Sequence, residues 1–101
     1  MYKIKYLSLA QKDLRCIVSY ISDTFKAPGA AMDLVDALET SISRLAQFPY
    51  SCRLYQPMEP LETEYRILPV KNYLVFYVVI GQEVEIHRII YARMNLENLI
   101  R

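Results

Sequence analysis

An unbroken run of apolar and aromatic residues, Tyr73–Ile80, constrains the fold of this chain more than any other feature. The run is far shorter than the roughly 20 residues that a membrane-spanning helix requires. It is rich in β-branched and aromatic side chains, which favour strands. Because apolar side chains point to both sides of such a strand, both of its faces must be at least partly covered. The sequence therefore predicts an interior strand of a sheet.

The flanking residues extend this strand into a meander. Gly81-Gln82 predicts a tight turn, and a second strand follows it. That strand has the two-residue period of a half-buried strand, because Val84, Ile86, Arg88 and Ile90 alternate with Glu85, His87, Ile89 and Tyr91. Upstream, a shorter strand covers Tyr65–Leu68 and meets Pro69. Proline has no N–H to donate, so we expect this strand at the sheet edge or ending there.

The first part of the chain predicts a short strand and an amphipathic helix. Tyr2, Ile4 and Tyr6 alternate with Lys3 and Lys5, so the lysines of this strand should face water. Ser8 and Gln11 have the spacing of a capping box at the start of the helix. Its apolar face carries Leu14, Ile17, Val18, Ile21 and Phe25. Ala27-Pro28-Gly29 should end it, because proline and glycine disfavour helix continuation there.

A second helix is predicted directly after this break, with Pro49 stopping it. Its apolar positions keep the helical period: Leu34, Val35, Leu38, Ile42, Leu45 and Ala46. Residues 50–62 have no period and predict a loop, and Leu96, Leu99 and Ile100 suggest a short terminal helix. The expected fold is a single α+β domain over residues 1–101, with order β-α-α-β-β-β(-α). Its helix hairpin should pack on one face of a small, mainly antiparallel sheet.

Composition excludes several classes of function. The formal charge of +1 argues against a strongly basic nucleic-acid binder. One histidine and two separated cysteines cannot complete a zinc site, and two glycines provide no nucleotide-binding loop, so no metal or cofactor is expected. A hydrophobic content of 53% in 101 residues must leave apolar surface outside, which favours a protein partner.

The chain is expected to act in the cytoplasm. No apolar run is long enough to span a membrane, and the first residues lack the apolar core of a signal peptide. Cys16 and Cys52 form no recognisable motif, and we expect both thiols to be free, as in a reducing compartment.

Three stretches resemble the RelE/ParE superfamily of bacterial type II toxins. They are the helix hairpin ending in Phe48-Pro49, the block YRILPVKNYLVFYVV and the ending VEIHRIIYARMNLENLI, and the resemblance covers essentially the whole chain. It implies a small cytoplasmic toxin in a hetero-oligomer with a cognate antitoxin that neutralises it. One branch of the superfamily cleaves messenger RNA on the ribosome, and the ParE branch poisons DNA gyrase.

Individual positions slightly favour the ParE branch. Leu74 stands where the ribonuclease branch has an arginine, and Leu68 and Leu99 occupy two further positions where that branch presents basic, tyrosine or histidine residues. Leucine can neither transfer a proton nor stabilise phosphoryl charge. The favoured interpretation is therefore binding to a protein target, DNA gyrase, without chemistry of its own.

Two alternatives remain open. A metal-independent endoribonuclease acting on the ribosome and messenger RNA would need a divergent catalytic set: Arg66, His87, Arg88, Tyr91 and Arg93. If the gyrase interpretation holds, Arg88, Tyr91 and Arg93 would recognise the protein target instead. The other alternative is a decayed toxin that retains only antitoxin binding, which Ala92 and Met94 suggest because related sequences often carry glycine and paired arginines there.

Each candidate residue also has a purely structural interpretation. His87 could be a cross-strand partner near Glu85, and Arg88 could pair with an acidic side chain. Arg66 could form a surface ion pair with Glu64 or Glu83. Tyr91 and Arg93 follow or end the last strand, where exposed side chains suit either phosphate contact or protein recognition.

Overall fold

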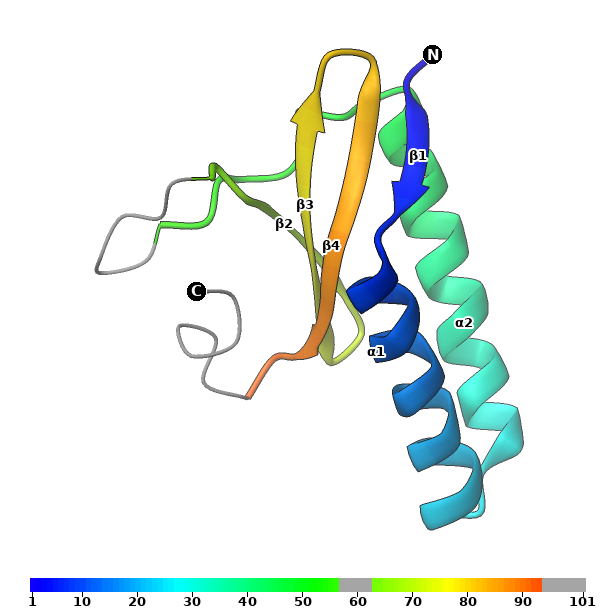
Figure 1. Ribbon diagram of the computed structural model, residues 1–101. Helices are drawn as coiled ribbons and strands as arrows, with labels where there is room; N and C mark the ends of the chain where they lie inside the picture. The colour runs from blue at the N-terminus through cyan, green and yellow to red at the C-terminus, as the bar shows by residue number, and fades with distance from the viewer. Residues whose placement is uncertain (57–62, 94–101) are drawn as a thin grey trace.

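A computed structural model describes residues 1–56 and 63–93. Two layers form the molecule, a pair of helices and a sheet (Figure 1). In chain order the elements are β1 (Lys3–Tyr6), α1 (Ser8–Ser19), the π-helical turn η1 (Tyr20–Thr24), α2 (Pro28–Ser43), the 3₁₀ turn η2 (Arg44–Ala46), β2 (Arg66–Val70), β3 (Tyr73–Ile80) and β4 (Glu83–Tyr91). The terminal helix predicted around Leu96, Leu99 and Ile100 lies outside the described residues, as does part of the predicted loop.

The sheet has the strand order β1-β4-β3-β2. β2, β3 and β4 form the predicted antiparallel meander, so β3 is interior and β2 lies at an edge, where Pro69 is tolerated. Gly81 begins the β3–β4 turn with φ +59°, a conformation that glycine adopts without strain. β1 pairs with β4 in parallel, because the chain returns to the sheet only after both helices. The predicted α+β fold is confirmed.

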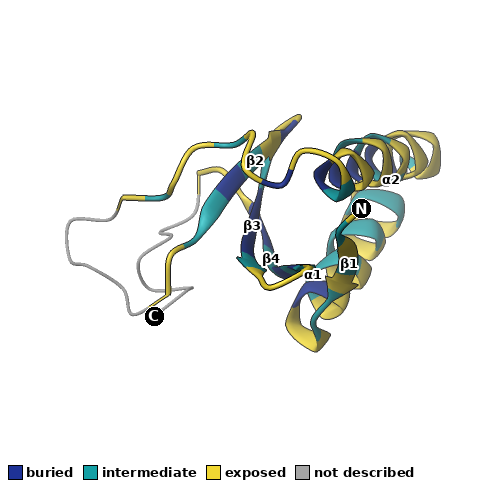
Figure 2. Cartoon of the chain, turned by 90° about the horizontal axis from the view of Figure 1, so that it is seen from above, coloured by how far each residue is buried: buried dark blue, intermediate teal, exposed yellow. Residues whose placement is uncertain are grey.

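Both faces of β3 are covered, as its sequence requires. The helices lie on one side of the sheet (Figure 2). The larger core lies between the helices and this face and includes Leu34, Leu38, Ile42, Leu45, Val75, Tyr77, Val84, Ile86 and Ile89. Tyr77 is fully buried there, and its hydroxyl donates to the Pro49 carbonyl oxygen at 2.8 Å. A smaller cluster on the opposite face contains Ile67, Phe76 and Ile90, packed against Tyr55, Tyr65 and Leu74.

The predicted capping box at the start of α1 is wrong. The N-cap position belongs to Leu7 and has no side-chain cap, while Gln11 donates from its side chain to the Tyr6 carbonyl oxygen at 3.2 Å. The reason is that pairing with β4 continues one residue past β1, where the Leu7 N–H donates to the Ile86 carbonyl oxygen at 3.0 Å. Ser8 therefore lies inside the first helical turn rather than at its cap.

The strict alternation predicted for β4 is interrupted by a bulge. Tyr77 pairs with Ile86 while its neighbour Phe76 pairs with Arg88, which leaves His87 as the extra residue. Beyond the bulge the faces exchange: Ile89 joins Ile86 in the helix-side core. Arg88 therefore does not share a face with Val84 and Ile86, contrary to the sequence prediction.

The helix hairpin is longer than the sheet that it covers. In Figure 1 the end of α1 and the start of α2 project past the β2–β3 turn. Phe25, expected in the buried stripe, is 62% exposed; it directly follows η1, where the first helical segment ends. The break between the helices lies where predicted, but Pro28 is already the first residue of α2, where its missing N–H has no consequence.

Candidate functional site

Arg88 is bound to the first helix. Its guanidinium donates to both carboxylate oxygens of Asp13, with Nε to Oδ2 at 2.7 Å and Nη2 to Oδ1 at 2.9 Å. The same carboxylate accepts the Ile89 backbone N–H at 3.0 Å. This charge-assisted fork raises the pKa of Arg88 further above its ordinary value. Arg88 thus joins α1 to β4, which corresponds to its structural interpretation as the partner of an acidic side chain.

His87 lies in a polar chain on the sheet face opposite the helices. Its Nδ1 is 3.2 Å from the Tyr65 hydroxyl, and its Nε2 is 3.2 Å from Glu85 Oε1. A neutral ring protonated on Nε2 satisfies both contacts, donating to the carboxylate and accepting from the hydroxyl. Burial raises the pKa of Tyr65, so its hydroxyl remains a donor at neutral pH. His87 therefore has one partner on its own strand, Glu85, and one from outside that strand, Tyr65.

Arg66 holds the loop after the helices against the edge strand. Its Nη1 donates to the Cys52 carbonyl oxygen at 2.7 Å, and its guanidinium carbon lies 5.0 Å from the centre of the Tyr50 ring. Leu54 of the same loop forms a bridge with Arg66. Neither Glu64 nor Glu83 forms a salt bridge with it among the described residues.

Tyr91 and Arg93 lie at the open end of β4. Tyr91 is 38% exposed and packs edge to face against Tyr73, with ring centres 5.5 Å apart. Arg93 is exposed two residues beyond the strand. Both side chains are accessible, as an exposed recognition pair requires.

The five candidate residues do not gather at one point. Paired residues of an antiparallel ladder share a face. Arg66 and Tyr91 pair with Tyr77 and Tyr73, which belong to the helix-side face, whereas His87 contacts Tyr65 on the opposite face. No group of three metal-ligating side chains occurs in the described part of the chain. The structure thus places Arg66 and Tyr91 on one face of the sheet, and His87 and Arg88 on the other.

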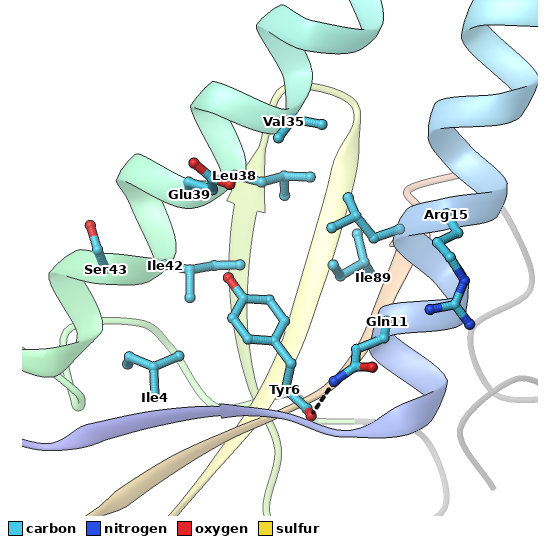
Figure 3. Close-up of a pocket in the computed structure, with 11 residues that line it drawn as sticks. Ile4, Tyr6, Gln11, Arg15, Val35, Leu38, Glu39, Ile42, Ser43 and Ile89 are labelled. Atoms are coloured by element: carbon cyan, nitrogen blue, oxygen red, sulfur yellow. Dashed lines mark hydrogen bonds between the residues drawn. The ribbon is translucent and has the colours of Figure 1, made fainter.

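A groove lies between the two helices. It has a volume of about 550 Å³, and its floor is apolar, formed by Ile4, Leu14, Val35, Leu38, Ile42 and Ile89. Figure 3 shows the Tyr6 ring rising from β1 between α1 and α2. Burial and the nearby Glu39 raise the pKa of Tyr6. Gln11, Arg15, Glu39 and Ser43 form a polar rim.

Sequence patterns did not indicate several of these residues. Asp13 lies 75 positions from Arg88, and Tyr65 lies 22 positions from His87. Neither pair has a local spacing that could have signalled the contact. The groove also depends on how far the two helices separate, which the helical periods leave open.

The two thiols are free, as predicted, and no helix among residues 1–56 and 63–93 has the length and apolarity to cross a membrane.

Comparison with known proteins identifies the family. The family model for the ParE toxin of the type II toxin–antitoxin system parDE matches residues 4–96. A solved structure of the chromosomal ParDE system from P. aeruginosa is similar, with a TM-score of 0.75 and 21% identity, over 92% of this chain and 98% of that one. The DinJ-YafQ complex of E. coli also has this fold, with a TM-score of 0.60 and 12% identity over 90% and 93% of the two chains.

A search of curated protein sequences gave no match. The family model nevertheless spans nearly the whole chain, and the resemblance seen in the sequence agrees with it. This chain belongs to the ParE toxin family of type II toxin–antitoxin systems.

Proposed function

We propose that this toxin acts by binding DNA gyrase, without bond-breaking chemistry of its own, and that a cognate antitoxin neutralises it. The observation that carries this proposal is the division of the candidate residues between the two faces of the sheet. Cleavage of RNA needs a base, an acid and a cation around one phosphate. Two of the candidate cations already have partners within the chain: Arg66 donates to the Cys52 carbonyl oxygen, and Arg88 donates to the Asp13 carboxylate.

The antitoxin should bind in the groove between the helices. The groove is apolar at its floor and polar at its rim, which suits an amphipathic helix that buries its apolar stripe and leaves its charges at the edge. The free thiols fit a reducing compartment, and DNA gyrase is an intracellular target, so both support a cytoplasmic location for the proposed complex.

The test of mechanism expresses the toxin without antitoxin and follows two signals, gyrase-dependent DNA cleavage and cuts in translated messenger RNA. We expect stalled gyrase complexes and intact messages. Ribosomal cuts that disappear in Arg93→Ala and Tyr91→Phe would instead assign these residues to catalysis. Neither signal, with antitoxin binding retained, would identify a decayed toxin.

The test of the antitoxin surface uses Val35→Glu, which places a charge in the apolar floor of the groove. We expect antitoxin binding to weaken by at least about tenfold, since a buried unpaired charge costs several kcal/mol. Phe48→Ala is the control, because Phe48 is exposed and does not line the groove. Equal antitoxin affinity of Val35→Glu and the unsubstituted chain would place the antitoxin elsewhere.

A further inference from the structure

A second concave surface lies where the helix hairpin projects past the sheet. This recess, of about 790 Å³, lies between the end of α1 with η1 and the end of the sheet. Ile17, Tyr20, Ile21 and Phe25 line its helix side, and Tyr73 and Tyr91 line its sheet side. It shares no lining residue with the groove between the helices. The two surfaces can therefore serve two different partners.

Four aromatic rings surround the recess in two edge-to-face pairs. Tyr20 and Phe25 have ring centres 5.0 Å apart at 87°, and the Tyr73–Tyr91 pair has an interplanar angle of 66°. Three of the rings are substantially exposed: Tyr20 (53%), Phe25 (62%) and Tyr91 (38%). Tyrosine is enriched among the few residues that carry most of the binding energy at protein interfaces. The recess thus has the composition of a binding surface.

Basic residues lie one or two positions in sequence from lining residues on both the helix side and the sheet side of the recess. Exposed Lys26 follows Phe25, exposed Lys71 precedes Asn72, and exposed Arg93 lies two residues after Tyr91. The acidic residue Asp23 and the basic residue Arg15 both line a neighbouring hollow that also includes Tyr20. The charge around the opening is therefore mainly positive and complements an acidic partner.

Lys26 and Lys71 have an unusual backbone. They are the two non-glycine residues with positive φ in the described part of the chain, at +54° and +53°. Glycine or asparagine adopts this conformation more readily than lysine. Strained residues concentrate at functional sites, and here each of them is next in sequence to a residue that lines the same recess. The backbone at these two positions is therefore less favourable than glycine would make it, which singles out both lysines for a test of function.

We propose that the recess binds an acidic protein segment with a large apolar side chain at its centre, and, resting on the proposed function, that this segment belongs to gyrase. The aromatic rings would enclose the apolar side chain, and the basic residues would pair with the flanking carboxylates. A nucleic-acid strand fits less well. It requires open ring faces for stacking and a strongly basic path, whereas these rings pack edge to face and the chain has a charge of +1.

The experiment measures the affinity of the full-length toxin for purified gyrase subunits and for the antitoxin. Phe25→Ala and Lys71→Glu test the recess. Phe48→Ala is matched to Phe25 in exposure, both being 62% exposed, and Lys3→Glu reverses an exposed charge on β1. We expect the recess variants to bind gyrase at least about tenfold more weakly and the controls to bind as the unsubstituted chain does. All variants should retain antitoxin binding, which reports an intact fold.

Lys71→Gly separates the side chain from the turn. It relieves the positive φ, so its melting temperature should equal or exceed that of the unsubstituted chain. If the ammonium group contacts the partner, gyrase binding should nevertheless weaken. Full gyrase affinity of Lys71→Gly and Phe25→Ala would overturn the inference and leave the proposed function intact.

Failure of the proposed function has a different signature, in which the unsubstituted chain does not bind gyrase. Growth arrest in cells lacking antitoxin then decides. Arrest lost in Phe25→Ala and Lys71→Glu but kept in the controls would retain the recess as the target site. Growth arrest that is unchanged in Phe25→Ala and Lys71→Glu, or that is absent even with the unsubstituted chain, would refute the recess as the target site. Loss of single-stranded oligonucleotide binding, or of dimerisation, in these two variants would assign the recess to nucleic acid or to a second copy.

Discussion

Replacing Asp13 with alanine removes the carboxylate that binds both Arg88 and the Ile89 N–H, and we expect a large loss of stability. The two side chains are mostly buried, with 15% of Asp13 and 19% of Arg88 exposed. An exposed ion pair contributes about 0–1 kcal/mol, and breaking a fully buried one costs about 3–5 kcal/mol. This pair lies between these limits, and the Ile89 backbone N–H loses its acceptor as well. We therefore expect a decrease of about 2–3 kcal/mol in the free energy of unfolding.

Urea denaturation followed by circular dichroism measures this loss. In a domain of this size about 1 kcal/mol corresponds to about 4–8 °C, so the melting temperature of Asp13→Ala should fall by about 10–20 °C. Asp36→Ala, which removes an exposed carboxylate from α2, serves as the control and should change stability by less than about 0.5 kcal/mol. A double-mutant cycle with Arg88→Ala should give a coupling energy of about 1–2 kcal/mol.

The cycle also decides the role of Arg88. If Arg88 only stabilises the fold, Arg88→Ala and Asp13→Ala should lose similar amounts of stability. Under conditions in which both variants are folded, both should bind gyrase as the unsubstituted chain does. An Asp13→Ala variant that loses less than about 0.5 kcal/mol would refute the energetic reasoning. A stable Arg88→Ala variant with weakened gyrase binding would make Arg88 a recognition residue.

Two further predictions concern buried and strained positions. Tyr77→Phe should lose about 1–2 kcal/mol of stability in urea titrations at neutral pH, because the Pro49 carbonyl loses its buried donor. Burial raises the pKa of Tyr77, so the folded state keeps a proton that the unfolded state releases near pH 10. The free energy of unfolding should therefore fall as the pH rises above about 10. In Tyr77→Phe, which has no such proton, the free energy of unfolding should fall less over the same pH range. Gly81→Ala should lower the free energy of unfolding by about 1–2 kcal/mol, because its φ is +59°. Gly29→Ala, in α2 with nothing within 4 Å of the new methyl group, should leave stability equal or higher in the same assay, and equal losses at both glycines would contradict the conformational argument.

The sequence alone determined the order and type of the main helices and strands that the structure describes. The apolar run Tyr73–Ile80 could be satisfied only by an interior strand, and it is one. Pro69 predicted an edge strand, and the Gly81 turn fixed the hairpin. These predictions succeed because periodicity and turn chemistry are local properties, set by a residue and its near neighbours.

Tertiary structure decided what the site residues do. Periodicity placed Arg88 on the face of Ile86, but the bulge at His87 moved it, and Asp13 reaches it from the other end of the sequence. A bulge depends on the register between two paired strands, and this ion pair depends on how α1 packs against β4. Neither feature therefore has a signal in the local sequence. Phe25 was assigned to the core on helical spacing, which is correct for the helix but cannot say where the sheet ends. The projecting hairpin, and the recess beneath it, follow from the relative lengths of elements that meet only in the folded chain.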